Sequence, residues 1–201
     1  MSRRIFTLLS FALLGCPRPA PPGDQSMGSW SVIAEPDEVM AGCQLTEVVH
    51  TDGGVDTLAF DMTLTRDTSS NAAWMTLAGI SREGTFDGQY FSNVAEASRV
   101  FTACAKCQMR VIERFDVAVL SRSQADALGG CPRNVLDFGV VPAANDAGIT
   151  APMQTPQGFD AVRLCGFISN EVVADGLEDG GACDAKCSGC FVTFLARGER
   201  R

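Results

Sequence analysis

The 201-residue sequence predicts a mainly β domain: an antiparallel β-sandwich or partly open barrel that is stapled by disulfides and carries one or two short helices. Three observations predict this fold class. Apolar side chains alternate with polar ones in short stretches, Asp-Gly turn pairs separate these stretches, and the chain contains 9 cysteines. At 46% hydrophobic residues, the chain is apolar enough to form a packed core instead of a disordered polypeptide.

The clearest predicted strand is 56–65, where every second residue from Leu58 to Leu64 is apolar. The stretch 74–80 is apolar on both sides and is typical of a central strand. Aromatic and β-branched residues favour further strands at 86–91, 115–119 and 191–196.

One short helix is predicted at 123–128. Ser121 or Ser123 would be its N-cap, and Gly129 would end it. The stretch 94–101 fits a helix or a strand equally well. Residues 142–158 contain several prolines and are expected to form a long loop.

Residues 1–15 have the pattern of an export signal, because two arginines precede the apolar run 5–15. That run is too short for a membrane-spanning helix, which needs roughly 20 residues. The sequence Leu13-Leu14-Gly15-Cys16 resembles the lipobox of bacterial lipoproteins. The resemblance implies cleavage before Cys16, diacylglycerol on its sulfur and attachment to a membrane through this lipid. The alternative is a plain secretory signal, with Cys16 an ordinary thiol.

Residues 16–28 are expected to form the lipidated cysteine and a proline-rich tether, since four prolines in 17–22 favour an extended conformation. Residues 29–201 would then form a single disulfide-rich domain. In enteric bacteria an aspartate directly after the lipidated cysteine tends to retain a lipoprotein in the inner membrane. Pro17 stands in that position here, which favours the outer membrane of a bacterial envelope, with the domain in the periplasm or at the cell surface.

Eight cysteines follow Cys16, and an even number in an exported chain predicts structural disulfides whose pairing the sequence does not reveal. They are Cys43, Cys104, Cys107, Cys131, Cys165, Cys183, Cys187 and Cys190.

Two sharper interpretations compete for some of these cysteines. The spacing Cys104-x-x-Cys107 is that of a redox pair and loosely resembles the thioredoxin superfamily, which implies thiol–disulfide exchange. Together with Cys187 and Cys190, the same pair has the local spacing of zinc ligands, but the two halves lie much further apart than in a zinc ribbon. We therefore expect structural bridges and no metal.

No set of acid, base and nucleophile stands out, and His50 is the only histidine. The sequence thus predicts a non-catalytic envelope lipoprotein, without a cofactor, that binds a protein partner or supports an envelope assembly. The alternative is an envelope thiol–disulfide oxidoreductase that uses Cys104 and Cys107. A formal charge of -8, without a basic run, argues against nucleic-acid binding.

Overall fold

The computed structural model describes residues 20–39, 56–101, 104, 106–136, 154–155, 158–177, 183, 187 and 189–201. The signal segment 1–15, Cys16, residues 17–19 of the tether, Cys43 and His50 lie outside these residues, so the predictions made for them stay predictions. The rest of the expected tether is described, and its last four residues, 25–28, belong to the first strand of the barrel.

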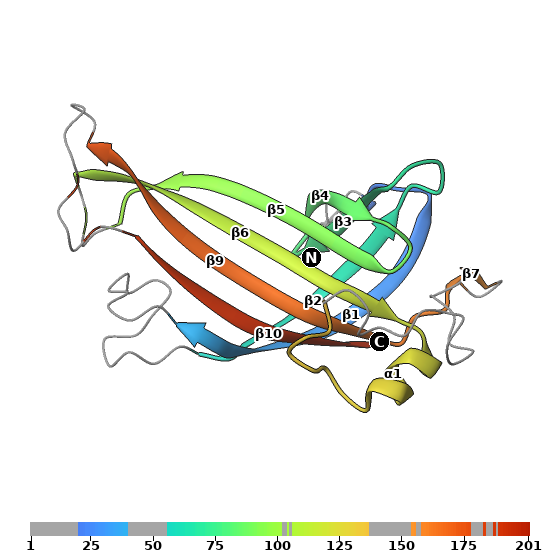
Figure 1. Ribbon diagram of the computed structural model, residues 1–201. Helices are drawn as coiled ribbons and strands as arrows, with labels where there is room; N and C mark the ends of the chain where they lie inside the picture. The colour runs from blue at the N-terminus through green and yellow to red at the C-terminus, as the bar shows by residue number, and fades with distance from the viewer. Residues whose placement is uncertain are drawn as a thin grey trace, which may run out of the picture.

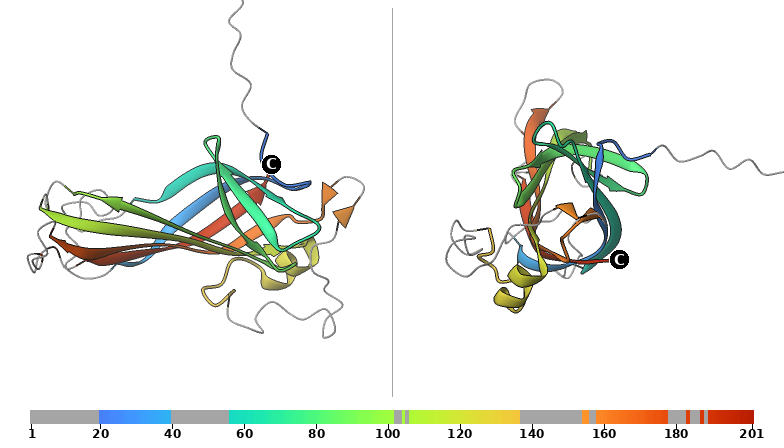
Figure 2. Two further views of the ribbon diagram at one scale, coloured as in Figure 1. Left: turned by 90° about the horizontal axis from the view of Figure 1, so that it is seen from above. Right: turned by 90° about the vertical axis from the view of Figure 1, so that its right-hand side faces the viewer.

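The main sheet is a closed antiparallel barrel (Figures 1 and 2). Each strand pairs with the next one along the chain, and the last pairs with the first, which is an up-and-down topology. The prediction of a mainly β, antiparallel, disulfide-stapled fold is confirmed, and the sheet is a closed barrel instead of a sandwich or partly open barrel. The barrel strands are β1 (Gln25–Val39), β2 (Leu58–Arg66), β3 (Ala72–Leu77), β4 (Ile80–Phe86), β5 (Tyr90–Arg99), β6 (Cys107–Leu120), β9 (Arg163–Leu177) and β10 (Cys190–Arg200).

Alternating side chains fill the barrel interior. On β2, Met62 and Leu64 are buried as the period of two predicts, whereas Leu58 is only partly buried at the start of the strand. On β1, Trp30 and Ala34 are fully buried in the same way. These residues belong to one apolar cluster, to which all eight barrel strands contribute side chains. The middle of the barrel is therefore a packed core.

Two of the predicted strands contain turns. The stretch 74–80 is interrupted at Ala78, which has a φ of 49°, and Gly79, so that β3 and β4 form a hairpin there. The stretch 86–91 turns at Asp87, whose carboxylate accepts the backbone N–H groups of Gln89 and Tyr90 at 2.9 and 2.7 Å. The prediction of a continuous strand at 74–80 is wrong, because apolar residues on either side of a tight turn resemble one uninterrupted strand. At 86–91 the predicted strand is divided by the turn that the Asp87-Gly88 pair of the sequence indicates.

The helix α1 (Arg122–Leu128) confirms the predicted helix and both of its ends. Ser121 is the N-cap and forms a capping box with Gln124, while Gly129 ends the helix in the left-handed conformation, with a φ of 66°. The undecided stretch 94–101 belongs largely to β5. The helix and the residues after it cover the outer face of β6 through a second apolar cluster that includes Ala118, Leu120, Ala125, Val135 and Cys165.

The barrel has two different ends (Figure 1). One end carries α1 and a small hairpin of β7 (Gln154–Thr155) and β8 (Gly158–Phe159), and we call it the α1 end. The other, the cysteine end, is formed by the long strands β5, β6, β9 and β10 and their connections. β1 begins at Gln25, four residues before the predicted start of the domain.

Candidate functional site

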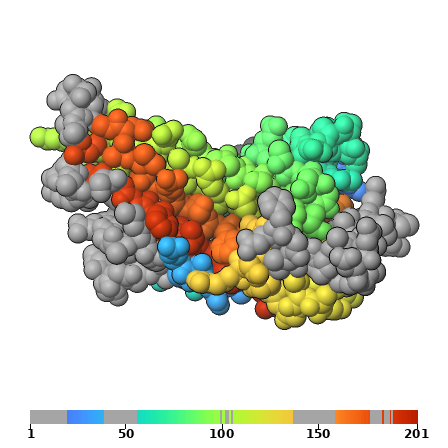
Figure 3. All heavy atoms as spheres, viewed as in Figure 1, coloured from blue at the N-terminus to red at the C-terminus, as the bar shows by residue number. Residues whose placement is uncertain are grey.

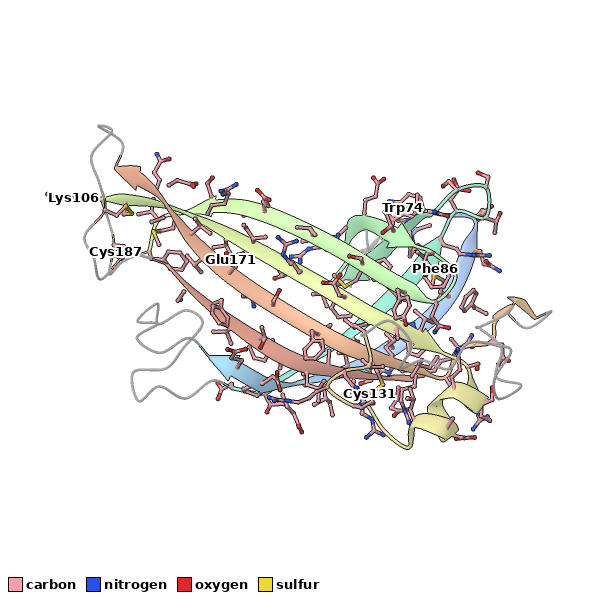
Figure 4. All side chains as sticks on the ribbon, viewed as in Figure 1. Trp74, Phe86, Lys106, Cys131, Glu171 and Cys187 are labelled. Atoms are coloured by element: carbon pink, nitrogen blue, oxygen red, sulfur yellow. A yellow bond between two sulfur atoms is a disulfide. The ribbon has the colours of Figure 1, made fainter. Side chains whose placement is uncertain are left out.

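The cysteine end holds two disulfides that join the start of β6 and the connection before it to the β9–β10 connection. Cys104 is bonded to Cys187 and Cys107 to Cys183, with Cα–Cα distances of 6.0 and 5.7 Å. Cys187 and Lys106 lie at this tip in Figure 4. The bridges pack with buried apolar neighbours, Phe101, Met109 and Val172 among them.

This pairing bears directly on the two Cys-x-x-Cys interpretations. Cys104 and Cys107 are each bonded to a residue of the other connection and not to one another, and both are at least 95% buried. A redox pair requires a Cys104–Cys107 bond with an accessible sulfur, and this arrangement offers neither. The same bonds leave no thiolate for a metal, and no group of three or more His, Cys, Asp or Glu suited to a metal ion occurs among the described residues.

A third disulfide joins Cys131 to Cys165 and ties the segment after α1 to the outer face of β9. Cys190 is also disulfide-bonded. All seven cysteines that the structure describes are therefore oxidised. Several disulfides in one chain indicate a protein of an extracytoplasmic, oxidising compartment.

A groove with a volume of about 580 Å³ lies on the outside of the barrel, over β1 and β10. We call it the β1–β10 groove. Its volume falls within the range of about 300–1,000 Å³ that is typical of small-molecule sites. The described residues that line it are Ser31, Ile33, Glu35, Cys131, Leu195, Arg197 and Glu199.

The floor of the groove consists of three neighbouring pairs across β1 and β10. Antiparallel register places Ser31 opposite Glu199, Ile33 opposite Arg197, and Glu35 opposite Leu195. Because side chains alternate along a strand, all six point outward while their neighbours fill the core. The floor is therefore as rigid as the closed sheet beneath it.

One wall of the groove is the segment that follows α1. The Cys131–Cys165 disulfide fixes the start of this segment beside Arg197, since Cys165 pairs with Arg197 across β9 and β10. Further along, the Arg133 guanidinium forms an ion pair with Asp37 of β1 and donates to its carbonyl oxygen at 3.3 Å. Figure 3 shows the same neighbourhood, with β1 in blue between β10 in red and the segment after α1 in yellow.

Charged groups at one end of the groove bind one another. Glu199 accepts from Arg197 at 2.7 and 2.9 Å and from Arg163 at 3.0 Å. Burial alone would raise the pKa of the Glu199 carboxyl, but the hydrogen bonds and positive charges of these two arginines outweigh it and hold that pKa below its ordinary value. At the other end, Glu35 is exposed and Ile33 is 52% exposed. The groove thus places two apolar side chains, Ile33 and Leu195, beside the exposed carboxylate of Glu35.

The sequence prediction missed this site, although one signal was present. Between Trp30 and Ala34, every second residue is apolar and belongs to one face of the strand. The other face carries the polar Ser31 and then the apolar Ile33. A large apolar residue on the solvent side of an otherwise alternating strand marks an exposed apolar patch. The wall could not be predicted, because it depends on a disulfide between distant residues.

No helix among the described residues is both long enough and apolar enough to span a membrane. Comparison with known proteins finds no matching family model, no matching curated protein and no matching solved structure.

Proposed function

We propose that this chain is a lipid-anchored protein of the bacterial envelope, most simply of the outer membrane, whose barrel is a non-catalytic binding module. The β1–β10 groove is the observation that carries the binding role. It combines an exposed apolar residue, a free carboxylate and a rigid floor, whereas the described residues contain no metal-ligand cluster and no accessible thiol pair.

The lipid would hold the α1 end of the barrel near the membrane. Thr65 of β2 donates to the carbonyl oxygen of Pro22, and the Asp24 backbone N–H donates to the carbonyl oxygen of Arg66, so the chain is fixed to the barrel from Pro22 onward. Only five residues lie between Cys16 and Pro22, and the six steps from Cα to Cα limit the reach of the tether to about 20 Å. A barrel on so short a tether stays close to the lipid headgroups.

The anchor is tested by comparing the wild type with Cys16→Ala after membrane fractionation of the producing cells. We expect the wild type in the membrane fraction, with labelled fatty acid incorporated, and the variant uncleaved and unlabelled. If the variant is processed and partitions into the membrane as the wild type does, the lipid anchor is wrong.

The binding role is tested by placing a photo-crosslinking amino acid at Ile33 of the full-length chain in intact cells. Ile80 on the β3–β4 hairpin is a matched control, because it is an isoleucine that is 67% exposed and lies outside the groove. We expect one discrete crosslinked species from Ile33 and none from Ile80. Crosslinks of equal yield and pattern from both positions would refute a specific partner at the groove.

A further inference from the structure

The α1 end of the barrel is closed by an aromatic side chain that does not come from a barrel strand. Phe159 is 98% buried, although it belongs to β8, a two-residue strand outside the barrel sheet. Its ring meets the Phe86 ring edge to face, with centroids 5.7 Å apart. The Arg66 guanidinium lies over both rings, 5.6 Å from the centroid of Phe159 and 5.8 Å from that of Phe86.

Hydrogen bonds to the ends of β6 and β10 hold the segment that delivers Phe159, among them that of the Arg200 N–H to the carbonyl oxygen of Val162 at 3.3 Å. Arg200 donates to the carbonyl oxygen of Phe159 and to that of Ala161, the latter at 3.0 Å. The Val162 N–H donates to the carbonyl oxygen of Leu120 at 2.8 Å. We call residues 158–162 the strap. Figure 4 marks the place by Phe86, at the end of the barrel away from Cys187.

Among the residues that the structure describes, two buried hydrogen-bond donors near this end have no partner. The amide nitrogen of Gln25 is unpaired, although the oxygen of the same amide accepts from Arg66 Nε. The indole nitrogen of Trp30 is unpaired as well, and that side chain lies beside Arg200, since a Cβ at Gly28 would be 3.5 Å from the indole ring and 3.2 Å from Arg200 Nε. Gln25 is 94% buried and Trp30 fully buried. Buried donors without acceptors are rare and call for a missing partner.

One guanidinium group lies near each of these donors, Arg66 beside Gln25 and Arg200 beside Trp30. Arg66 and Arg200 both lie at the α1 end, one over the aromatic rings and the other on the strap. Asp24 and Asp67 are close along the chain, but their carboxylates accept from Thr68 and Ser69 respectively. An anionic group at this end would therefore meet donors and guanidinium groups.

We propose that the α1 end of the barrel is a binding site for a small aromatic carboxylate, and that Phe159 occupies its aromatic half when the ligand is absent. The ligand ring would take the place of the Phe159 ring against Phe86 and beneath Arg66. Its carboxylate would accept from the unpaired nitrogens of Gln25 and Trp30. The inference goes beyond the proposed function, because it concerns the inside of the barrel and not the outer groove.

The test measures binding of phenylacetate, toluene and acetate to the purified wild type and to Phe159→Ala by calorimetry. The wild type must first displace its strap, which reduces its apparent affinity by the fraction of open protein. We expect Phe159→Ala to bind phenylacetate at least about tenfold more tightly than the wild type does. The same variant should bind toluene about tenfold more weakly than phenylacetate, and it should not bind acetate measurably. Adding Gln25→Leu should weaken phenylacetate and leave toluene unchanged.

Three outcomes would overturn the proposal: no binding of phenylacetate to either protein, equal binding of toluene and phenylacetate to Phe159→Ala, or no effect of Gln25→Leu. The second outcome would mean that the substitution merely opens an apolar hole. If Phe159→Ala does not fold, the hydrogen-exchange rate of the Val162 amide is compared in the wild type with and without phenylacetate. Binding must displace the strap and so accelerate this exchange, and an unchanged rate would refute the proposal. Ile33→Ala should leave phenylacetate binding unchanged, which separates this site from the groove.

Discussion

The two bridges of the cysteine end close almost the same loop, so losing one should matter far less than losing both. The Cys104–Cys187 and Cys107–Cys183 bridges span 83 and 76 residues, a difference of 7. While one bridge remains, removing the other frees a ring of only about seven residues. By the loop-entropy relation, this lowers the free energy of unfolding by about 2.4 kcal/mol.

Once both bridges are absent, the long loop itself is released. The Cys131–Cys165 bridge lies inside that loop and ties off 34 residues of it. Roughly 42 residues remain, and the same relation gives about 4 kcal/mol for releasing them. Removing both bridges should therefore cost about 6 kcal/mol, about 1.5 kcal/mol more than the sum of the two separate losses.

The measurement is equilibrium unfolding in urea, without reductant, of four proteins: the wild type, Cys104→Ala/Cys187→Ala, Cys107→Ala/Cys183→Ala and the protein with all four substitutions. Each variant removes a whole bridge, so no lone thiol remains to exchange. If each separate loss already costs about 4 kcal/mol, or if the losses simply add, the two bridges do not constrain one shared loop and the reasoning is refuted.

Three further predictions concern other parts of the chain. Glu199→Gln should lower the melting temperature more at pH 7 than at pH 3. A carboxyl whose pKa is depressed in the folded state stabilises the protein above its ordinary value of 4.5, and this contribution is lost as the pH falls through the folded-state value. Equal effects at both pH values would contradict this. Gly166→Ala should destabilise by about 2 kcal/mol or more in urea unfolding, since its Cβ would lie 2.0 Å from a backbone oxygen of β6, while Gly130→Ala, with nothing within 4 Å, should be neutral. Peptide mapping without reductant should find Cys190 linked to Cys43. The six other described cysteines are paired among themselves, and Cys16 is expected to carry lipid. A link between Cys16 and Cys190 would refute both this pairing and the lipid anchor.

Local pattern was sufficient to predict some elements of the fold. The alternation from Leu58 to Leu64 predicted β2, because a half-buried strand needs just that period. The helix α1 was predictable to within one residue, since Ser121 and Gly129 satisfy the backbone groups at its two ends. Such features depend on residues that are neighbours in the sequence.

Features that depend on distant residues could not be predicted. Barrel closure requires β1 to pair with β10, and no local signal at Trp30 specifies Arg200 as its partner. The disulfide pairing has the same origin. The spacing of Cys104 and Cys107 suggested a local pair, but the antiparallel register of β6 with β9 brings Cys107 opposite Leu177 and so places the two connections side by side.

The candidate site could be predicted only in part from the sequence. Ile33 could have been noticed as an apolar residue on the polar side of its strand, but a groove also needs a wall. That wall is built by the Cys131–Cys165 disulfide and the ion pair of Arg133 with Asp37, which join residues far apart in the sequence. Sequence reasoning could therefore identify a surface patch but not its depth.

The pairing of β1 with β10 sets an order of events for the making of this protein. β1 emerges early from the ribosome, yet it finds one of its two partners only after residues 190–200 have been delivered. Contacts of such long sequence separation form late and slowly. The barrel therefore stays open until its last strand has been delivered. The same delay exposes the apolar face of β1 to wrong partners until β10 arrives.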